Sequence, residues 1–224
     1  DGLLARERGR LALRRRDPVT AVAALERAVA STPTDLEAQL MLMDAYIIGE
    51  NTTGAQRVDN ELKRSYPQRP ERMLAAGRTA LLANQVVEAR DAFAEAQRGL
   101  ARAPHRVRAD AAYWLGLATF IGGDPGLAKA ALVDATRLDP FNADAHAVLG
   151  QVLRALGDVG GAIASFRRAQ ELDPDNVELN ADLGELLATR QPKDAIRALD
   201  RYLAKVPTGE RADSVRALLA RLRR

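Results

Sequence analysis

The sequence lacks several residue types and segments, and each absence excludes a class of protein. Its 224 residues include no cysteine, so disulfides, thiolate metal sites and cysteine nucleophiles are excluded. Aromatic residues make up only 4% and alanine is abundant, which favours tightly packed helices over sheets. No apolar run approaches the roughly 20 residues that a membrane-spanning helix needs. The sequence therefore predicts a helical protein without a transmembrane segment.

The ends and the basic residues of the chain give little information on the compartment. No signal peptide is visible, and the first residue is Asp1, which indicates either a removed leader or a piece of a longer protein. Lysine accounts for 4 of the 33 basic residues, a bias that we associate with a GC-rich bacterial genome. We expect a bacterial protein, and the cytoplasm and the periplasm both remain open.

Side-chain sets that could support catalysis or cofactor binding are also missing. His105 and His146 have no partner at metal-ligand spacing. The Gly-Gly pairs at 122–123 and 160–161 lack the Lys-Ser/Thr that follows a phosphate-binding loop. The basic segments carry no interleaved aromatic residues for stacking on bases. We predict no catalytic residues, no metal, no cofactor and no nucleic-acid partner.

Charge is distributed unevenly along the chain. The net charge is +3, yet residues 1–16 carry six arginines against two acids, and residues 216–224 carry four arginines and no acid. The segment between these two basic ends is therefore acidic. We interpret the basic ends as solvated caps, and the alternative is that they attract an acidic partner or surface.

A regular pattern of prolines and helical apolar stripes divides the chain. Within 143–176, apolar residues recur at helical spacing, and the same pattern reappears 34 residues earlier, with Leu149 on Leu115 and Gly150 on Gly116. No stretch alternates at the period of a strand. Prolines close successive units at intervals of 33 to 37 residues, at Pro33, Pro67, Pro104, Pro140, Pro174 and Pro207.

These residues resemble the pattern of the tetratricopeptide repeat family. Residues of the unit at 143–176 match its helix-packing positions and its closing proline: Leu149, Gly150, Ala162, Phe166, Ala169 and Pro174. The resemblance implies an all-α fold, a right-handed superhelical solenoid of six antiparallel helix pairs with a C-terminal capping helix. We expect a single array with units at 2–35, 36–69, 70–108, 109–142, 143–176 and 177–209, and the capping helix at 210–223. Two units depart from the pattern, with Arg8 in place of a leucine and Asp59 in place of an aromatic residue.

The resemblance also implies a binding surface, because the first helix of each unit lines a concave groove in this family. The family positions give this set of partner-binding residues: Leu40, Met41, Asp44, Ile47, Leu74, Arg78, Leu81, Tyr113, Trp114, Leu117, Phe120, Gln151 and Arg154. An apolar strip with polar ends suits an amphipathic helix or an apolar peptide. Two interpretations remain open for Trp114, which either faces the groove or packs in the core.

We therefore predict a non-enzymatic scaffold that binds a helical or extended segment of a partner protein. An alternative is a self-assembling or cell-envelope assembly module in secretion, pilus, cytochrome-maturation or exopolysaccharide machinery. That alternative rests on family analogy, and it expects self-association between basic ends and an acidic middle. An enzyme is disfavoured because no nucleophile–base pair or metal set is present.

Overall fold

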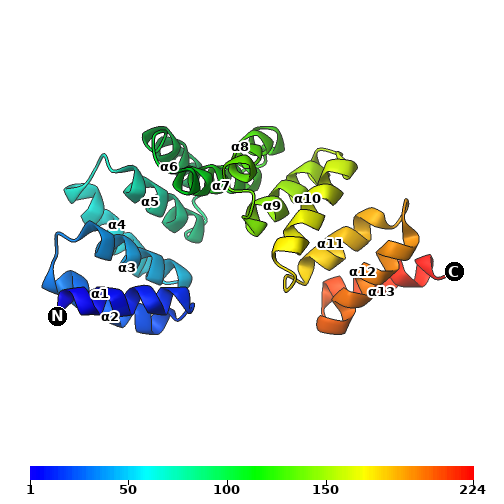
Figure 1. The fold of residues 1–224 in the computed structure, drawn as a ribbon, viewed down its shortest axis with the longest axis horizontal. Coiled ribbons are helices and arrows are strands. Elements are labelled where there is room, and N and C mark those ends of the chain that lie inside the picture. The colour runs from blue at the N-terminus through cyan, green and yellow to red at the C-terminus, as the bar shows by residue number, and fades with distance from the viewer. The chain divides into compact units, whose positions relative to one another are not determined.

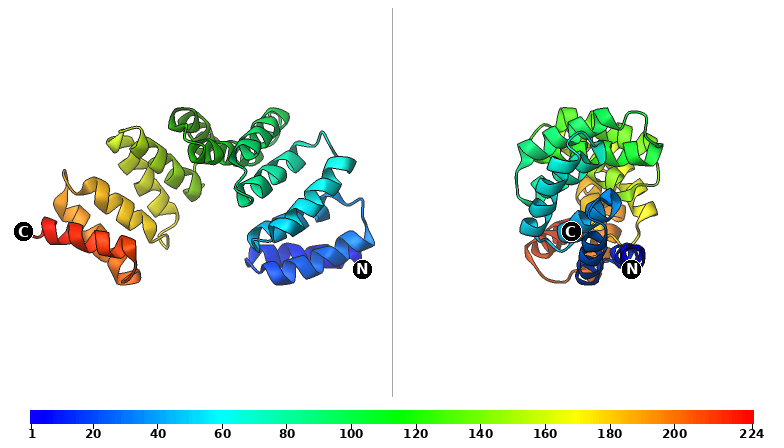
Figure 2. Two further views of the ribbon diagram at one scale, coloured as in Figure 1. Left: turned by 180° about the vertical axis from the view of Figure 1, so that it is seen from behind. Right: turned by 90° about the vertical axis from the view of Figure 1, so that its left-hand side faces the viewer.

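The computed structural model describes all 224 residues as thirteen α-helices without a strand, in two compact units (Figures 1 and 2). Unit 1 spans residues 1–122 and unit 2 spans residues 123–224. The helices of unit 1 are α1 (Gly2–Arg14), α2 (Pro18–Ser31), α3 (Leu36–Ile48), α4 (Thr52–Ser65), α5 (Pro70–Leu82), α6 (Val86–Gly99) and α7 (His105–Ile121). Those of unit 2 are α8 (Pro125–Leu138), α9 (Ala143–Ala155), α10 (Val159–Leu172), α11 (Glu178–Leu187), α12 (Pro192–Lys205) and α13 (Glu210–Leu222).

Consecutive helices pack as antiparallel hairpins within each unit. In unit 1, α1 packs on α2, α3 on α4 and α5 on α6, and α7 packs on α6. In unit 2, α8 packs on α9, α9 on α10, α11 on α12 and α12 on α13. The all-α solenoid of repeated helix pairs expected from the sequence is therefore confirmed. The boundary between the units falls between α7 and α8, the two helices of the expected fourth repeat.

Short polar side chains start many of the helices. The carboxylate of Asp17 accepts a hydrogen bond from the backbone N–H of Thr20 at 3.0 Å, and that of Asp124 accepts one from Leu127 at 2.9 Å. Both residues precede a proline in the first helical turn, where the missing N–H has no helical partner in any case. At these two helix starts, the N-capping carboxylate and the proline together satisfy or remove backbone donors that have no helical acceptor.

The helix-pair turns place one residue in the left-handed backbone region. These residues all occupy the same repeat position, with φ values between 54° and 85°: Arg16, Glu50, Asn84, Gly123 and Gly157. Only glycine adopts this conformation without a steric penalty from a Cβ atom. The turn geometry therefore explains glycine at this position before α8 and α10.

Glycine in the first helix allows a large side chain of the second helix to approach. A Cβ atom on Gly77 would lie 2.5 Å from the ring of Phe93, and one on Gly150 would lie 2.7 Å from the ring of Phe166. Both phenylalanines are completely buried. Because these contacts leave no room for a methyl group, the glycine and the aromatic residue form one packing unit in each pair.

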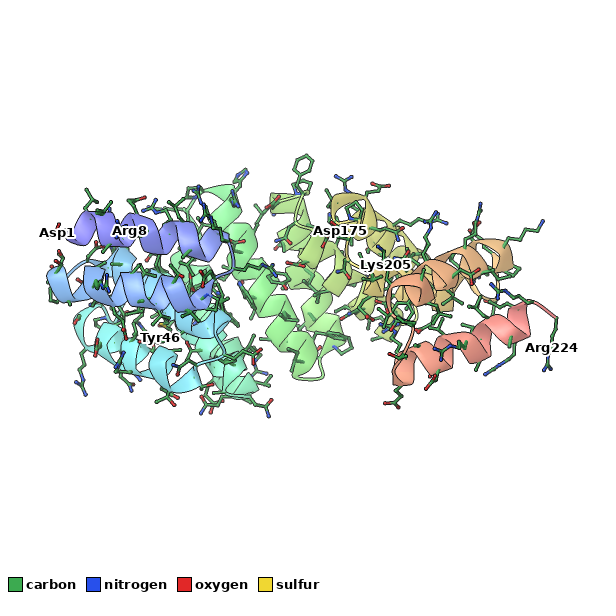
Figure 3. The ribbon with its side chains drawn as sticks, turned by 90° about the horizontal axis from the view of Figure 1, so that it is seen from below. Asp1, Arg8, Tyr46, Asp175, Lys205 and Arg224 are labelled. Carbon is green, nitrogen blue, oxygen red and sulfur yellow. The ribbon has the colours of Figure 1, made fainter.

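The α3–α4 pair reverses this arrangement. Met43 stands where other first helices have glycine, and it is fully buried. The small residue is instead Gly54 of α4, where a Cβ atom would lie 2.6 Å from the ring of Tyr46 (labelled in Figure 3). Asp59, at the usual aromatic position, accepts a hydrogen bond from the buried Arg72 at 3.1 Å. Met43, a large residue on the opposite helix, therefore compensates for the missing aromatic side chain at Asp59.

The residues inserted between the third and fourth repeats extend a helix. The sequence places the start of the fourth unit at residue 109, whereas α7 begins at His105. Val107 packs against a buried cluster of Met73, Ala96 and Leu100. Burial of Val107 thus gives the added helical turn a packing partner.

Candidate functional site

The predicted binding residues lie on first helices, eleven of them in unit 1 and two in unit 2. In unit 1 they belong to α3, α5 and α7, and in unit 2 Gln151 and Arg154 belong to α9. Arg154 is exposed and the other twelve are half-buried. None of the thirteen side chains is fully buried, so each presents some surface to solvent.

The first helices of unit 1 form its inner face. Helix α1 packs on α3, α3 on α5 and α5 on α7, whereas the second helices α2, α4 and α6 do not pack closely on one another. A stack of hairpins whose first helices lie closer together than its second helices curves toward the first helices. We call the surface of α1, α3, α5 and α7 on this side the inner face of unit 1.

Apolar residues of the inner face pack partly on the buried core. Three of them on α3, Leu40, Met41 and Ile47, contact the buried cluster that contains Leu25, Met43 and Leu62. Leu74 and Leu81 of α5 pack in the same way on the cluster around Phe93. Each side chain therefore has a supported side and a solvent-facing side, which gives a firm apolar surface.

An aromatic and charged cluster lies at the α5–α7 end of the inner face. The ring of Trp114 stacks on that of Phe93 with centroids 5.9 Å apart and meets the ring of Tyr113 edge-on at 5.1 Å. The guanidinium carbon of Arg78 lies 5.2 Å from the centroid of Trp114. Trp114 thus packs on the core and also borders the inner face, so both interpretations of this residue describe part of its surroundings.

Arg78 also joins this cluster to α3. Its Nη1 donates a hydrogen bond to Asp44 Oδ1 at 2.5 Å. Burial raises the pKa of Asp44 above its usual value, and the positive charge of Arg78 partly opposes that rise. The pair is partly desolvated, and it holds the Arg78 side chain across the gap between two first helices.

The α1 end of the inner face is neutralised by α3. Arg6 Nη1 donates to Asp35 Oδ2 at 2.8 Å, and Arg10 Nη2 donates to Glu37 Oε1 at 2.8 Å. From the sequence alone the first helix is expected to be basic. The structure shows that acids of the next repeat lie opposite its arginines. The inner face therefore alternates ion pairs with apolar side chains.

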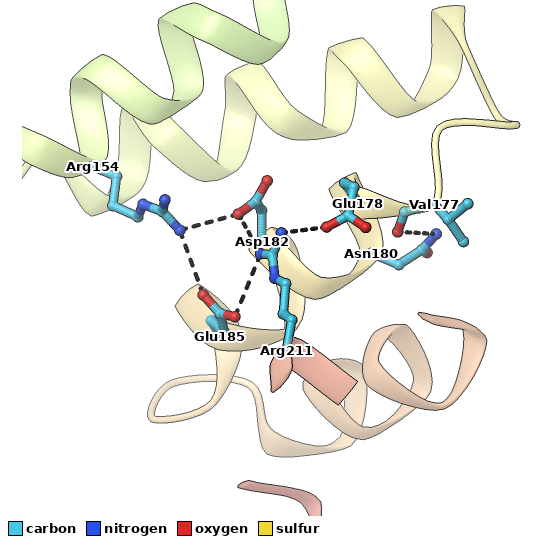
Figure 4. A network of polar contacts seen from close by, with 7 residues as sticks. All are labelled: Arg154, Val177, Glu178, Asn180, Asp182, Glu185 and Arg211. Atoms are coloured by element: carbon cyan, nitrogen blue, oxygen red, sulfur yellow. Dashed lines mark hydrogen bonds and ion pairs between the residues drawn. The ribbon is translucent and has the colours of Figure 1, made fainter. Parts of the chain in front are cut away.

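Unit 2 contains a denser charge network on its first helices (Figure 4). Asp182 of α11, whose side chain is only 6% exposed, accepts hydrogen bonds from Arg154 of α9 at 3.1 Å and from Arg211 of α13 at 2.7 Å. Arg211 also contacts Glu178 at 2.5 Å and Glu185 at 3.4 Å. Burial disfavours the charged form of Arg211, but these acids outweigh that effect and raise its pKa.

Of this network only Arg154 is among the predicted partner-binding residues, and Arg211 also lies outside the six predicted repeat units. Arg211 belongs to the predicted capping helix at 210–223, and its guanidinium group reaches the acidic residues of α11. Its position near the start of α13, one repeat length after Glu178, is the signal that could have identified it. Arg154 is a predicted partner-binding residue, and in the structure its guanidinium group forms ion pairs with Asp182 and Glu185.

The structure gives no metal-binding cluster, and its hollows are open. No group of three or more His, Asp or Glu side chains is placed to hold a metal ion. A hollow of about 570 Å³ in unit 2 is an open depression lined by residues such as Gln170, Val177 and Lys205. No helix has both the length and the apolar character required to cross a membrane.

The comparisons with known proteins concern the repeat and the fold. A tetratricopeptide repeat model matches residues 6–70 and 122–177, and a second model of this repeat matches residues 153–222. No curated protein sequence matches the chain at a significant level.

Several solved structures are similar to the chain. The structure of pilF from Pseudomonas aeruginosa shares 15% identity over 96% of each chain, with a TM-score of 0.81. PilW, described as a widely conserved type IV pilus biogenesis factor, shares 20% identity over 96% of this chain and 97% of its own, with a TM-score of 0.78. YrrB, described as a TPR protein with an unusual peptide-binding site, shares 20% identity over 88% and 100%, with a TM-score of 0.64. At these identities the similarity establishes a common fold.

Proposed function

The chain belongs to the tetratricopeptide repeat family, and we propose that it is a non-enzymatic scaffold whose inner face in unit 1 binds a helical or extended segment of a partner protein. The fold itself supports a role in protein–protein interaction, since these repeats are generally non-catalytic scaffolds. The observation that carries the proposal is the half-burial of all eleven predicted residues of unit 1.

The chemistry of the inner face favours an amphipathic segment. Leu40, Leu81 and Leu117 each offer apolar surface to solvent, and the Asp44–Arg78 pair lies among them. A partner segment with apolar residues at helical spacing would bury these leucines and place polar groups near the ion pair. Trp114 and Tyr113 add aromatic surface of the kind that contributes strongly at protein interfaces.

Partner capture from the native cell tests this proposal. We expect the double variant Leu81→Asn/Leu117→Asn to lose most of the partner recovered by the unaltered chain, because two apolar contacts become polar on the inner face. The measurement is quantitative mass spectrometry of affinity-purified complexes. These two substitutions leave the stacked pair of Phe93 and Trp114 intact.

The matched control is Val19→Asn/Val87→Asn, which changes two exposed apolar residues on the second helices α2 and α6. This control should retain the partner. Circular dichroism should show the same helix content for both double variants at the temperature of the capture experiment, although the inner-face variant should melt at a lower temperature because Leu81 packs partly on the core. Equal partner recovery by the two folded variants would rule out the inner face of unit 1 as the binding surface.

A second candidate is a role in assembly of a cell-envelope machine, specifically a type IV pilus. It is supported by the similarity to pilF and PilW, which extends over 96% of this chain in both cases. Pilus or envelope proteins recovered in the same capture experiment, and lost with the inner-face variant, would favour this candidate. Self-association would appear instead as copies of this chain among the recovered proteins.

A further inference from the structure

A second surface of unit 1, separate from the inner face, lies at its N-terminal end. Along α1 and its C-cap residue, four residues at helical spacing form one stripe, which consists of Leu4, Arg8, Leu11 and Arg15. Leu4 is 58% exposed and Leu11 is 52% exposed. Figure 3 shows Arg8 on this helix. We call this stripe, together with the adjoining side of α2, the end face.

The same repeat positions are covered by a helix elsewhere in unit 1. Ala111 and Ala118 of α7 correspond to Leu4 and Leu11 of α1, and both are completely buried. Ala111 packs on Ala96 of the preceding helix α6, and Ala118 packs in the cluster of α6 that contains Phe93. In α3 the corresponding residues are Ala38 and Ala45, which are also completely buried.

The end face is therefore a helix-packing surface by its repeat position. Every later first helix of unit 1 packs on the second helix of the preceding pair, as α3 does on α2, α5 on α4 and α7 on α6. Helix α1 has the same register but no such helix against it. Exposed leucines seven residues apart match the spacing of two turns of a helix lying alongside.

The shape of the end face fits one helix. Two adjoining hollows, of about 330 and 280 Å³, run along the junction of α1 and α2. Arg8, Ala24 and Arg27 line both hollows, Leu11 lines the first and Leu4 lines the second. The two hollows therefore form one trough that runs along the length of α1 beside α2. Apolar side chains lie along the trough and arginines lie at its rim.

The charge of the end face indicates the chemistry of the occupant. No ion pair or hydrogen bond engages the guanidinium groups of Arg8, Arg15 and Arg27, whereas Arg6 and Arg10 on the inner face are paired with acids of α3. Asp17 also lines the trough, but its carboxylate caps α2. Asp1 is the other acid, at the opposite end. Three unpaired arginines against these two acids leave a basic rim.

The repeat pattern supports the same conclusion. Arg8 stands where α3, α7, α9 and α11 carry leucine, at Leu42, Leu115, Leu149 and Leu183. Arg27 stands where α4 and α6 carry Glu61 and Glu95. The first pair thus exchanges apolar or acidic residues for arginine on the side where no helix of unit 1 covers it.

We propose that the end face binds an acidic amphipathic α-helix of a partner protein, which packs on Leu4 and Leu11 as α6 packs on α7. Small residues of that helix would lie against the leucines, as Ala89 and Ala96 of α6 lie against α7. Its acidic residues would pair with Arg8, Arg15 and Arg27 at the rim. This site is independent of the inner face, so the chain can hold two partner segments at once.

The test uses a fluorescein-labelled synthetic helix of about 21 residues, long enough to be helical, with alanine along one stripe and glutamate beside it. Fluorescence anisotropy with the full chain measures binding. The unaltered chain should bind this peptide, with weaker binding as salt increases. A matched peptide with lysine at each glutamate position should bind at least about tenfold more weakly.

Three variants of the chain locate the binding. Arg8→Glu/Arg15→Glu/Arg27→Glu should weaken binding of the glutamate peptide by at least about tenfold. The control Arg64→Glu/Arg98→Glu/Arg102→Glu makes the same change in net charge at exposed residues away from the end face, and it should bind like the unaltered chain. Leu4→Asn/Leu11→Asn, at exposed positions that do not support the core, should also weaken binding.

Three results would overturn the proposal. One is no measurable binding of the glutamate peptide, and another is equal binding of the lysine peptide. The third is an equal loss of binding in the two triple variants, which would indicate attraction by net charge alone. Light scattering addresses a second copy of the chain as occupant: a dimer that disappears with Arg8→Glu/Arg15→Glu/Arg27→Glu would replace the acidic partner helix by self-association.

Discussion

Replacing Asp182 by alanine is expected to lower the free energy of unfolding of unit 2 by about 3 kcal/mol, the lower end of the range for removing one partner from a buried charge cluster. Asp182 is nearly inaccessible to solvent and accepts hydrogen bonds from Arg154 and Arg211. Without it, both guanidinium groups lose their central acceptor, and α13 loses one of the three ion pairs that join Arg211 to α11. Native-state hydrogen exchange in α9, α11 and α13 measures the change directly.

Two further variants serve as controls for this prediction. Asp213→Ala removes an acid that is 73% exposed and pairs only with Arg216 of its own helix, so its effect should stay within about 0.5 kcal/mol. Asp182→Asn keeps the size of the side chain and one oxygen acceptor, so it should recover part of the loss. If Asp182→Ala destabilises unit 2 no more than Asp213→Ala, the network does not hold α13.

Replacing Trp114 by alanine is expected to lower the free energy of unfolding of unit 1 by about 2–3 kcal/mol, somewhat less than for a fully buried aromatic residue. The substitution removes the stack on Phe93, the edge contact with Tyr113 and the support of the Arg78 guanidinium. Denaturant titration followed by circular dichroism measures this loss. Tryptophan fluorescence cannot follow the variant, because Trp114 is the only tryptophan of the chain.

Trp114→Phe separates the core role from the binding role. Phenylalanine keeps an aromatic ring over Phe93, so we expect a loss of about 1 kcal/mol. Its smaller ring presents less surface beside Arg78. We therefore expect a clear loss of partner recovery although the free energy of unfolding changes little. A variant that captures the partner fully while losing stability would assign Trp114 to the core alone.

Most of the fold follows from short-range sequence signals. Prolines and N-capping acids end and begin helices through local backbone geometry, so the starts at Asp17-Pro18 and Asp124-Pro125 are predictable. The glycine at position 150 is predictable for a packing reason, because Phe166 occupies the space of its missing side chain. The start of α7 at His105 is not, since it depends on burial of Val107 against residues of another repeat.

The candidate site is less predictable because its charges pair between repeats. Family positions place Asp44 and Arg78 on the same surface, but their hydrogen bond depends on the distance between α3 and α5. Asp59 departs from the family pattern, and its partner Arg72 belongs to the next repeat. Arg211 lies outside the six units and completes the network of α11. Such pairings are set by the stacking of repeats, which a single repeat motif does not encode.

Site-specific photocrosslinking in the native cell tests the central claim most directly. A benzophenone side chain is introduced at Leu117 on the inner face of unit 1 or, as the control, at Val87 on the second helix α6. We predict that the Leu117 probe forms a crosslink to one partner segment, identified by mass spectrometry as an amphipathic sequence, and that the Val87 probe does not. Crosslinks to the same partner from Val87 but not from Leu117 would contradict a binding function of the inner face.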